Sequence, residues 1–117
     1  MASLESKTFE TPDERRTPPR AELAIVKFGD NTVTRVTYYP GFRWTTDVKP
    51  VAGTNLCQVT HFAYCLSGHL IVQMADGTQR QIGPGDIGII PAGHDAWVVG
   101  DEPCVSLDFG GIQHPPM

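Results

Sequence analysis

The chain has 117 residues, which is enough for one domain with a single core and too few for two. Its 13 acidic residues outnumber its 9 basic residues and give a net charge of −4, so we expect no nucleic-acid partner. No run of 18 apolar residues occurs and no apolar signal segment follows Met1. We therefore expect a cytoplasmic protein without a membrane partner.

The three cysteines, Cys57, Cys65 and Cys104, are an odd number, and their spacing fits no disulfide scaffold. We interpret them as reduced thiols in a reducing compartment. A thiolate ligand for a metal ion is then chemically available.

Three segments differ in composition. Residues 1–22 are polar and interrupted by prolines, which predicts an extended N-terminal arm. Residues 23–110 consist of short β-rich runs separated by turn formers, of which Asp76-Gly77 is the strongest hairpin signal. Residues 111–117 contain Pro115 and Pro116 and predict a loose C-terminal tail.

Eight or nine strands fit between residues 23 and 110, and no amphipathic helical stretch interrupts them. Many short strands with frequent turns predict an all-β fold, and a double-sheet jelly roll holds this number of strands at this length. The expected strands are Leu23–Phe28, Thr32–Tyr39, Phe42–Thr46, Leu56–Leu66, His69–Met74, Thr78–Ile82, Ile87–Ile90, Ala96–Val99 and Val105–Phe109.

The segment Gly83–Trp97 combines a glycine-proline turn, a strand and a second turn before His94. It resembles the second signature motif of the cupin superfamily, in which Gly, five residues, Pro, one residue and Gly are followed by a metal-binding His. Gly85, Pro91 and Gly93 match this motif, and Ala96 stands where the family has its histidine. The resemblance implies a double-stranded β-helix, which is the cupin jelly-roll barrel, over residues 23–110.

The segment Gly53–Gly68 resembles the other cupin motif, which carries His, one residue, His, three residues and Glu. Alignment on Tyr64-Cys-Leu-Ser-Gly68 places His61 at the Glu position, Cys57 at the second His position and Asn55 at the first. None of the four usual ligands is kept. Because strand side chains alternate, Asn55, Cys57 and His61 would face the barrel interior together.

A metal site therefore has to be argued from chemistry. Cys57, His61 and His94 offer one thiolate and two imidazoles, a set that suits a divalent ion, with zinc favoured and nickel or iron as alternatives. Asn55 is a reserve donor, and Tyr64 and Trp97 are candidates for a substrate pocket. His94 or Asp95 would transfer protons.

Each of these candidate site residues could also have a purely structural role. A cysteine in a strand often serves as a small hydrophobic residue, and a lone histidine is often part of a hydrogen-bonded structure. The pair His94-Asp95 could simply cap its turn. Tyr64 and Trp97 could belong to the core, as aromatic residues commonly do.

The cupin resemblance implies a scaffold that supports many reactions, so the fold alone selects none. Our first hypothesis is a metal-binding protein that binds or transforms a small molecule, with lyase, isomerase or hydrolase chemistry. The alternatives are a non-catalytic module that senses a small metabolite and a barrel kept as a dimerising unit. We also expect a homodimer, because jelly-roll edges need cover and the arm could lie along a partner, as related cupins are commonly dimers.

Overall fold

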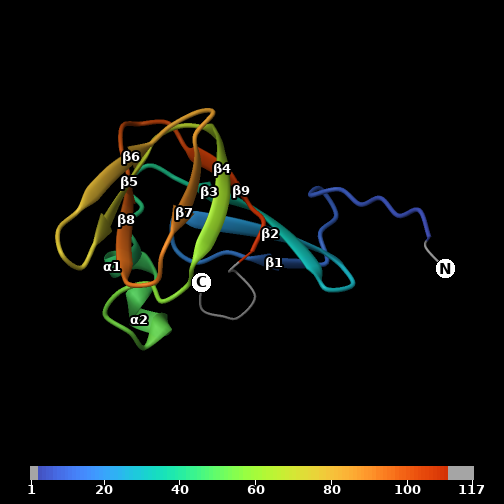
Figure 1. Ribbon diagram of the computed structural model, residues 1–117, viewed down its shortest axis with the longest axis horizontal. Helices are drawn as coiled ribbons and strands as arrows, with labels where there is room; N and C mark the ends of the chain where they lie inside the picture. The colour runs from blue at the N-terminus through green and yellow to red at the C-terminus, as the bar shows by residue number, and fades with distance from the viewer. Residues whose placement is uncertain (1–2, 111–117) are drawn as a thin grey trace.

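The computed structural model describes residues 3–110, so the predicted tail at 111–117 lies outside the described residues. Its strands form two antiparallel sheets that face each other (Figure 1). This agrees with the predicted all-β jelly roll. No helix among the described residues is long and apolar enough to cross a membrane.

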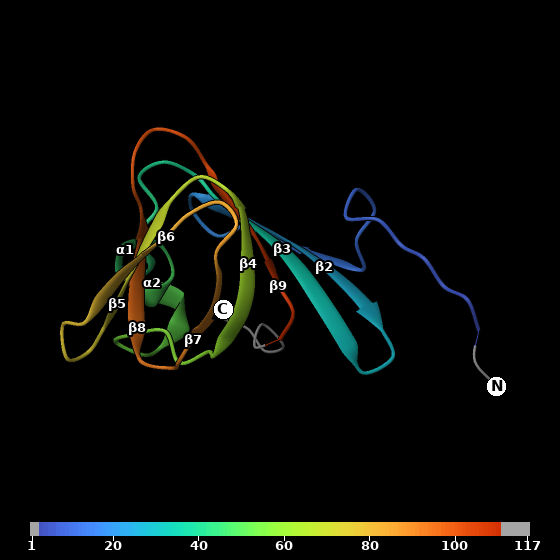
Figure 2. The same cartoon turned by 45° about the horizontal axis from the view of Figure 1, so that its top comes forward.

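The larger sheet has six strands in the order β1-β2-β3-β9-β4-β7, and the smaller has three in the order β6-β5-β8. The long β2–β3 hairpin extends to one side, away from the smaller sheet (Figure 2). The strands are β1 (Glu14–Arg16), β2 (Ala21–Phe28), β3 (Asn31–Tyr38), β4 (His61–Ser67), β5 (Leu70–Met74), β6 (Gln79–Ile82), β7 (Ile87–Ile90), β8 (His94–Val98) and β9 (Cys104–Asp108).

The turn residues act as the sequence predicts. Asp76 and Gly77 join β5 to β6, with Gly77 at φ 90° and the Asp76 carboxylate accepting the Thr78 amide at 2.9 Å. The Gly83–Gly85 turn joins β6 to β7. Gly68 leaves no room for a side chain, because a Cβ there would lie 2.1 Å from the Pro103 carbonyl oxygen.

The expected strand Phe42–Thr46 is wrong, because the short helix α1 (Trp44–Asp47) stands there and is followed by a second, α2 (Lys49–Ala52). The amide of Thr45 donates to Asp95 Oδ1 at 3.1 Å, and the amide of Arg43 donates to Asp47 Oδ2 at 3.0 Å. These carboxylates satisfy the free amides at the start of α1, as N-terminal caps do. The buried Trp44 then fixes α1 against the core.

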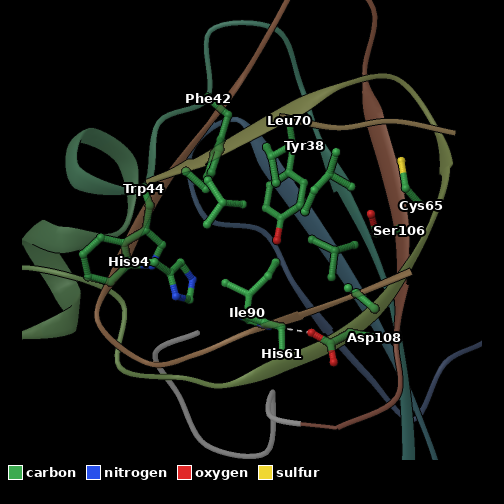
Figure 3. A pocket seen from close by; sticks show the side chains of 16 residues that line it. Tyr38, Phe42, Trp44, His61, Cys65, Leu70, Ile90, His94, Ser106 and Asp108 are labelled. Carbon is green, nitrogen blue, oxygen red and sulfur yellow. Dashed lines mark hydrogen bonds and ion pairs between the residues drawn. The ribbon is translucent and has the colours of Figure 1, made fainter. Parts of the chain in front are cut away.

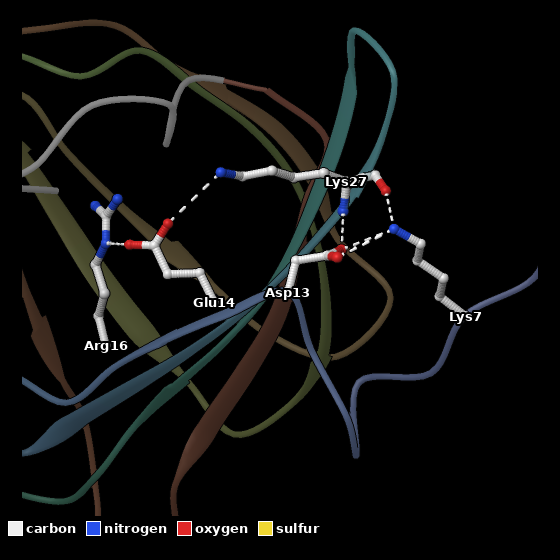
Figure 4. Close-up of polar contacts among 5 residues, drawn as sticks. All are labelled: Lys7, Asp13, Glu14, Arg16 and Lys27. Carbon is white, nitrogen blue, oxygen red and sulfur yellow. Dashed lines mark hydrogen bonds and ion pairs between the residues drawn. The ribbon is translucent and has the colours of Figure 1, made fainter.

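The N-terminal arm is partly ordered on its own chain. Glu14–Arg16 pairs with β2 as the edge strand β1, so sheet structure begins before the expected boundary at residue 23. Ahead of it, Lys7 Nζ donates to Asp13 at 3.1 Å and to the Lys27 carbonyl at 2.6 Å (Figure 4). These contacts hold the arm against its own sheet.

The core lies between the two sheets in two adjoining clusters. In the first cluster, side chains from β2, β3 and the helical segment pack together, with Leu23, Phe42 and Trp44 among its largest members. The other gathers Cys65 and Cys104 with Leu70 from the smaller sheet. Half-buried Tyr38 packs against both clusters and lines a cavity together with the polar groups of the candidate site.

Candidate metal centre

Cys57, His61 and His94 come together as a buried cluster whose donor atoms all lie within 4.8 Å of one another. Two backbone contacts bring Cys57 and His94 face to face. The Cys57 amide donates to the His94 carbonyl at 2.8 Å, and the His94 amide donates to the Cys57 carbonyl at 3.2 Å. Gly93, at φ 91°, turns the chain so that His94 begins β8 with its side chain inward.

His61 opens β4, and its ring lies edge-on to the His94 ring with the centroids 5.2 Å apart. Its Nδ1 donates to Asp108 Oδ2 at 2.5 Å (Figure 3). Its Nε2 lies 3.8 Å from Cys57 Sγ. The Asp108 carboxylate thus orients the ring and leaves Nε2 directed at the thiol.

His94 is oriented in the same way by a different acceptor. Its Nδ1 donates to the Pro91 carbonyl at 2.7 Å, so Nε2 is the nitrogen left for a metal ion. Histidine ligands commonly have their second nitrogen hydrogen-bonded in this manner, because that bond fixes the tautomer and ring orientation. Both imidazoles are therefore prepared to ligate through Nε2.

The two histidines of the cluster favour the thiolate form of Cys57. Burial by itself raises the pKa of Cys57, but hydrogen bonds to His61 and His94 outweigh it and bring the pKa to about 6. Burial lowers the pKa of His61, while Asp108 and the Cys57 thiolate outweigh that effect and raise it to about 9. The two groups form a thiolate–imidazolium pair near neutral pH.

A cavity of about 40 Å³ adjoins the cluster, which is room for roughly three water molecules. His61, His94 and Asp108 line it from one side (Figure 3). Most of its other walls are apolar, with polar groups from Tyr38 and Ser106.

The structure places the other predicted site residues away from this cavity. Asn55 is exposed in the bend that precedes Cys57, because the chain before His61 is not a regular strand. Tyr64 lies on the outer face of β4, by alternation from the inward His61 and Ala63. Trp97 also faces outward, and its ring stacks under the Arg43 guanidinium at 4.4 Å.

Asp95 is buried but points to α1 and not to the cavity. Its carboxylate accepts from Arg43 Nε at 2.9 Å, and from the amide and hydroxyl of Thr45 at 3.1 and 3.0 Å. Among the described residues, Asp95 does not line the cavity. Its hydrogen bonds give it a structural position.

Asp108 was not among the sequence-based candidates, although a signal for it exists. In Cys104–Asp108 the residues Cys104, Ser106 and Asp108 are buried and alternate with Val105 and Leu107. An acidic residue in register with inward-facing residues of a strand requires a buried partner. His61 is that partner.

The fold is also found in proteins of distant sequence. No family model and no curated relative matches the sequence. The polyketide cyclase RemF from Streptomyces resistomycificus superposes with a TM-score of 0.69 at 16% identity, over 97% of this chain and 83% of the other. KdgF from Halomonas sp. gives 0.64 at 18% identity, over 99% and 100% of the two chains.

A cupin-superfamily sugar phosphate isomerase from Silicibacter pomeroyi gives a TM-score of 0.63 at 17% identity, over 89% of this chain and 73% of the other. The protein therefore has the cupin fold, which confirms the fold expected from the glycine-proline framework. Its buried Cys57, His61 and His94 could hold a metal ion.

The line Cys57–His61–Asp108 is also the order of groups that activates a cysteine nucleophile. Two observations favour ligation. Cys57 is 1% exposed and does not belong to the described cavity wall, so a substrate carbonyl has no approach to Sγ. His94 adds a third donor on the other side, which a nucleophile does not require.

Proposed function

We propose that the protein binds one divalent metal ion, zinc in the first place, through Cys57, His61 and His94, and binds or transforms a small molecule in the adjoining cavity. The observation that carries this proposal is the pairing of both Nδ1 atoms. Because Asp108 and Pro91 occupy them, both Nε2 atoms remain beside the Cys57 thiol.

The distance between the Cys57 and His61 donors supports a zinc site. Zinc bonds of about 2.3 Å to sulfur and 2.0–2.1 Å to nitrogen, in tetrahedral geometry, put the two donors roughly 3.6 Å apart. The Sγ of Cys57 and Nε2 of His61 are 3.8 Å apart. Three protein donors leave a fourth position for a ligand, as in catalytic zinc sites.

A bound zinc would supply Lewis acidity toward an oxygen of the ligand, which suits lyase, isomerase or hydrolase chemistry. In this proposal the two histidines ligate, Asp108 orients His61, and the apolar walls offer water few hydrogen-bond partners. His94 ligates in this proposal, and Asp95 supports α1, so neither serves as the proton carrier.

A second function, sensing of a small metabolite without turnover, is supported by the cavity itself. Once His61 and His94 ligate and Asp108 holds His61, Tyr38 and Cys65 are the titratable groups left among the described lining residues. A protein that releases its bound metabolite unchanged, in native mass spectrometry after incubation, would have this function.

Metal analysis of untagged protein tests the metal proposal, since a histidine tag would bind zinc itself. We expect about one zinc per chain in the wild type and a loss in Cys57→Ala and His61→Ala. Cys104→Ala is the matched control, because Cys104 is equally buried but lies outside the cluster. Chelation should also lower the melting temperature. Wild-type protein that takes up no metal after zinc loading would refute the proposal.

We also propose a homodimer in a reducing compartment. All three cysteines are free thiols, and the sulfurs of Cys65 and Cys104 share a hydrogen bond at 3.9 Å instead of a disulfide. The outer face of the larger sheet exposes five large apolar side chains, on β4, on the edge strand β7 and just after β9. This apolar face consists of Phe62, Leu66, Ile87, Ile89 and Phe109.

A further inference from the structure

The hydroxyl of Tyr38 is a polar group inside the cavity without a partner in the described part of the chain. Tyr38 ends β3, and its ring packs against Phe42 with the centroids 4.8 Å apart. Its oxygen points into the open space above Ile90 (Figure 3). No hydrogen bond holds this hydroxyl among residues 3–110, and it is not a sealed atom, so it faces the cavity.

The hydroxyl acts as a donor there. Burial is the main cause that raises the pKa of Tyr38, and the negative charges of Asp108 and Cys57 raise it further. The phenol therefore stays protonated in the folded protein. A buried hydroxyl without an acceptor is costly, so whatever fills the cavity should offer it an oxygen.

The size of the cavity limits that occupant. About 40 Å³ holds roughly three water molecules, which corresponds to a ligand of about three to five non-hydrogen atoms. The walls contributed by Val36, Leu70 and Val72 are apolar and suit a short hydrocarbon part.

The charge of the site limits the occupant further. A divalent ion with one thiolate and two neutral imidazoles would carry one net positive charge at the metal, which attracts a single negative charge on the ligand; with the Asp108 carboxylate the whole site would be neutral and would offer nothing to a second one. A second negative charge on the ligand would lie in the same cavity as the Asp108 carboxylate. Small monocarboxylates satisfy both conditions.

Resting on the proposed metal function, we propose that Tyr38 is a ligand-binding residue: its hydroxyl donates to one carboxylate oxygen of a short monocarboxylate whose other oxygen faces the metal held by Cys57, His61 and His94. Tyr38 would then set the orientation of the ligand. It would also reject molecules of similar size that lack an oxygen acceptor, because the hydroxyl would remain unpaired.

The test uses acetate as the probe on zinc-loaded full-length protein, with Tyr38→Phe as the variant. Tyr39→Phe is the matched control, because Tyr39 is the next residue and is exposed. Zinc content is measured first on all three proteins. Acetate affinity is then measured by calorimetry, followed by formate, propionate and benzoate.

We expect equal zinc contents and acetate binding that is at least about tenfold weaker in Tyr38→Phe than in the wild type and Tyr39→Phe, since a hydrogen bond to a charged acceptor is lost. Benzoate should not bind. With ¹³Cζ-labelled tyrosine, acetate should shift the signal that is absent in Tyr38→Phe. This spectroscopic readout does not depend on any catalytic activity of the protein.

The two proposals can fail separately. Zinc-loaded protein in which Tyr38→Phe binds acetate as the wild type does, or in which acetate does not bind, overturns the role of Tyr38 and leaves the metal site standing. Benzoate binding as tight as acetate overturns the size limit. A wild type without zinc overturns the metal site and this inference with it.

Discussion

Oδ2 of Asp108 lies 2.5 Å from Nδ1 of His61, and this contact joins the last strand of the barrel to the first residue of β4. Both residues are buried, so the carboxylate has few alternatives to this bond. The bond keeps the proton on Nδ1 and leaves Nε2 toward Cys57. The orientation of one proposed ligand therefore depends on a residue 47 positions away in the sequence.

Replacing Asp108 should weaken metal binding without removing a ligand. In Asp108→Asn the amide can donate to Nδ1, which would place the ring proton on Nε2 and block it. We expect zinc affinity to fall roughly 10- to 100-fold, the usual effect of losing such a partner. Competition with a chromophoric chelator measures it. Asp76→Asn is the control, since Asp76 lies in the exposed β5–β6 turn, and equal affinities in both variants would contradict the role of Asp108.

The pKa values of Cys57 and His61 predict how metal binding depends on pH. Between pH 6 and 9 the pair holds one titratable proton. It lies on His61, as the second N–H of the imidazolium, because the pKa of His61 is raised to about 9 while that of Cys57 is lowered to about 6. A metal ligated by both groups must displace that proton. Below pH 6 Cys57 also becomes protonated, and the pair must then release two protons.

We therefore expect this pair to release one proton per zinc at pH 7.5, and the affinity to fall more steeply with acidity below pH 6. Calorimetry in two buffers of different ionisation enthalpy gives the number of protons. In metal-free protein, thiolate absorbance near 240 nm should rise as the pH passes about 6, and Cys57→Ser should lack this step. A step near pH 8.5 would show an ordinary thiol and exclude the ion pair.

The sequence predicts those elements whose signals are local. The bounds of Ile87–Ile90 coincide with β7 because glycine and proline turns enclose it on both sides. Phe42–Thr46 fails because its helix is capped by Asp95, about 50 residues away, which no local pattern reveals. In the site, alternation carries His61 inward but cannot place Asn55, because the bend between them is not a strand.

The hydrogen bonds of Asp95 predict a loss of stability and not a loss of the metal. Asp95→Ala removes the acceptor for the Thr45 amide and hydroxyl and for Arg43 Nε. Leaving these groups at the start of α1 unpaired should lower the free energy of unfolding by about 2–4 kcal/mol. Urea denaturation measures this, with the exposed Asp101→Ala as control. Unchanged stability, or loss of zinc from folded Asp95→Ala, would argue that Asp95 belongs to the site.

The apolar face predicts where two copies meet. Phe62 pairs with Ile89 across β4 and β7, and its ring lies 6.2 Å from that of Phe109. The five exposed side chains of this face present on the order of 500 Å² of mainly apolar surface, near the upper end for a monomer. Two such faces, fully covered, would bury about 1,000 Å², which is the lower threshold for a specific interface.

Ile89→Glu should therefore shift the protein from dimer to monomer in light scattering, because a charge would be buried at the centre of the contact. Ile89 is 71% exposed in the single chain, so the fold should tolerate the change, which circular dichroism checks. Val51→Glu is the matched control, because Val51 on α2 is 72% exposed and lies outside the apolar face. A wild-type monomer would remove the dimer proposal. Dimers in both variants would place the interface elsewhere, and the edge strand β1 would then be the next surface to alter.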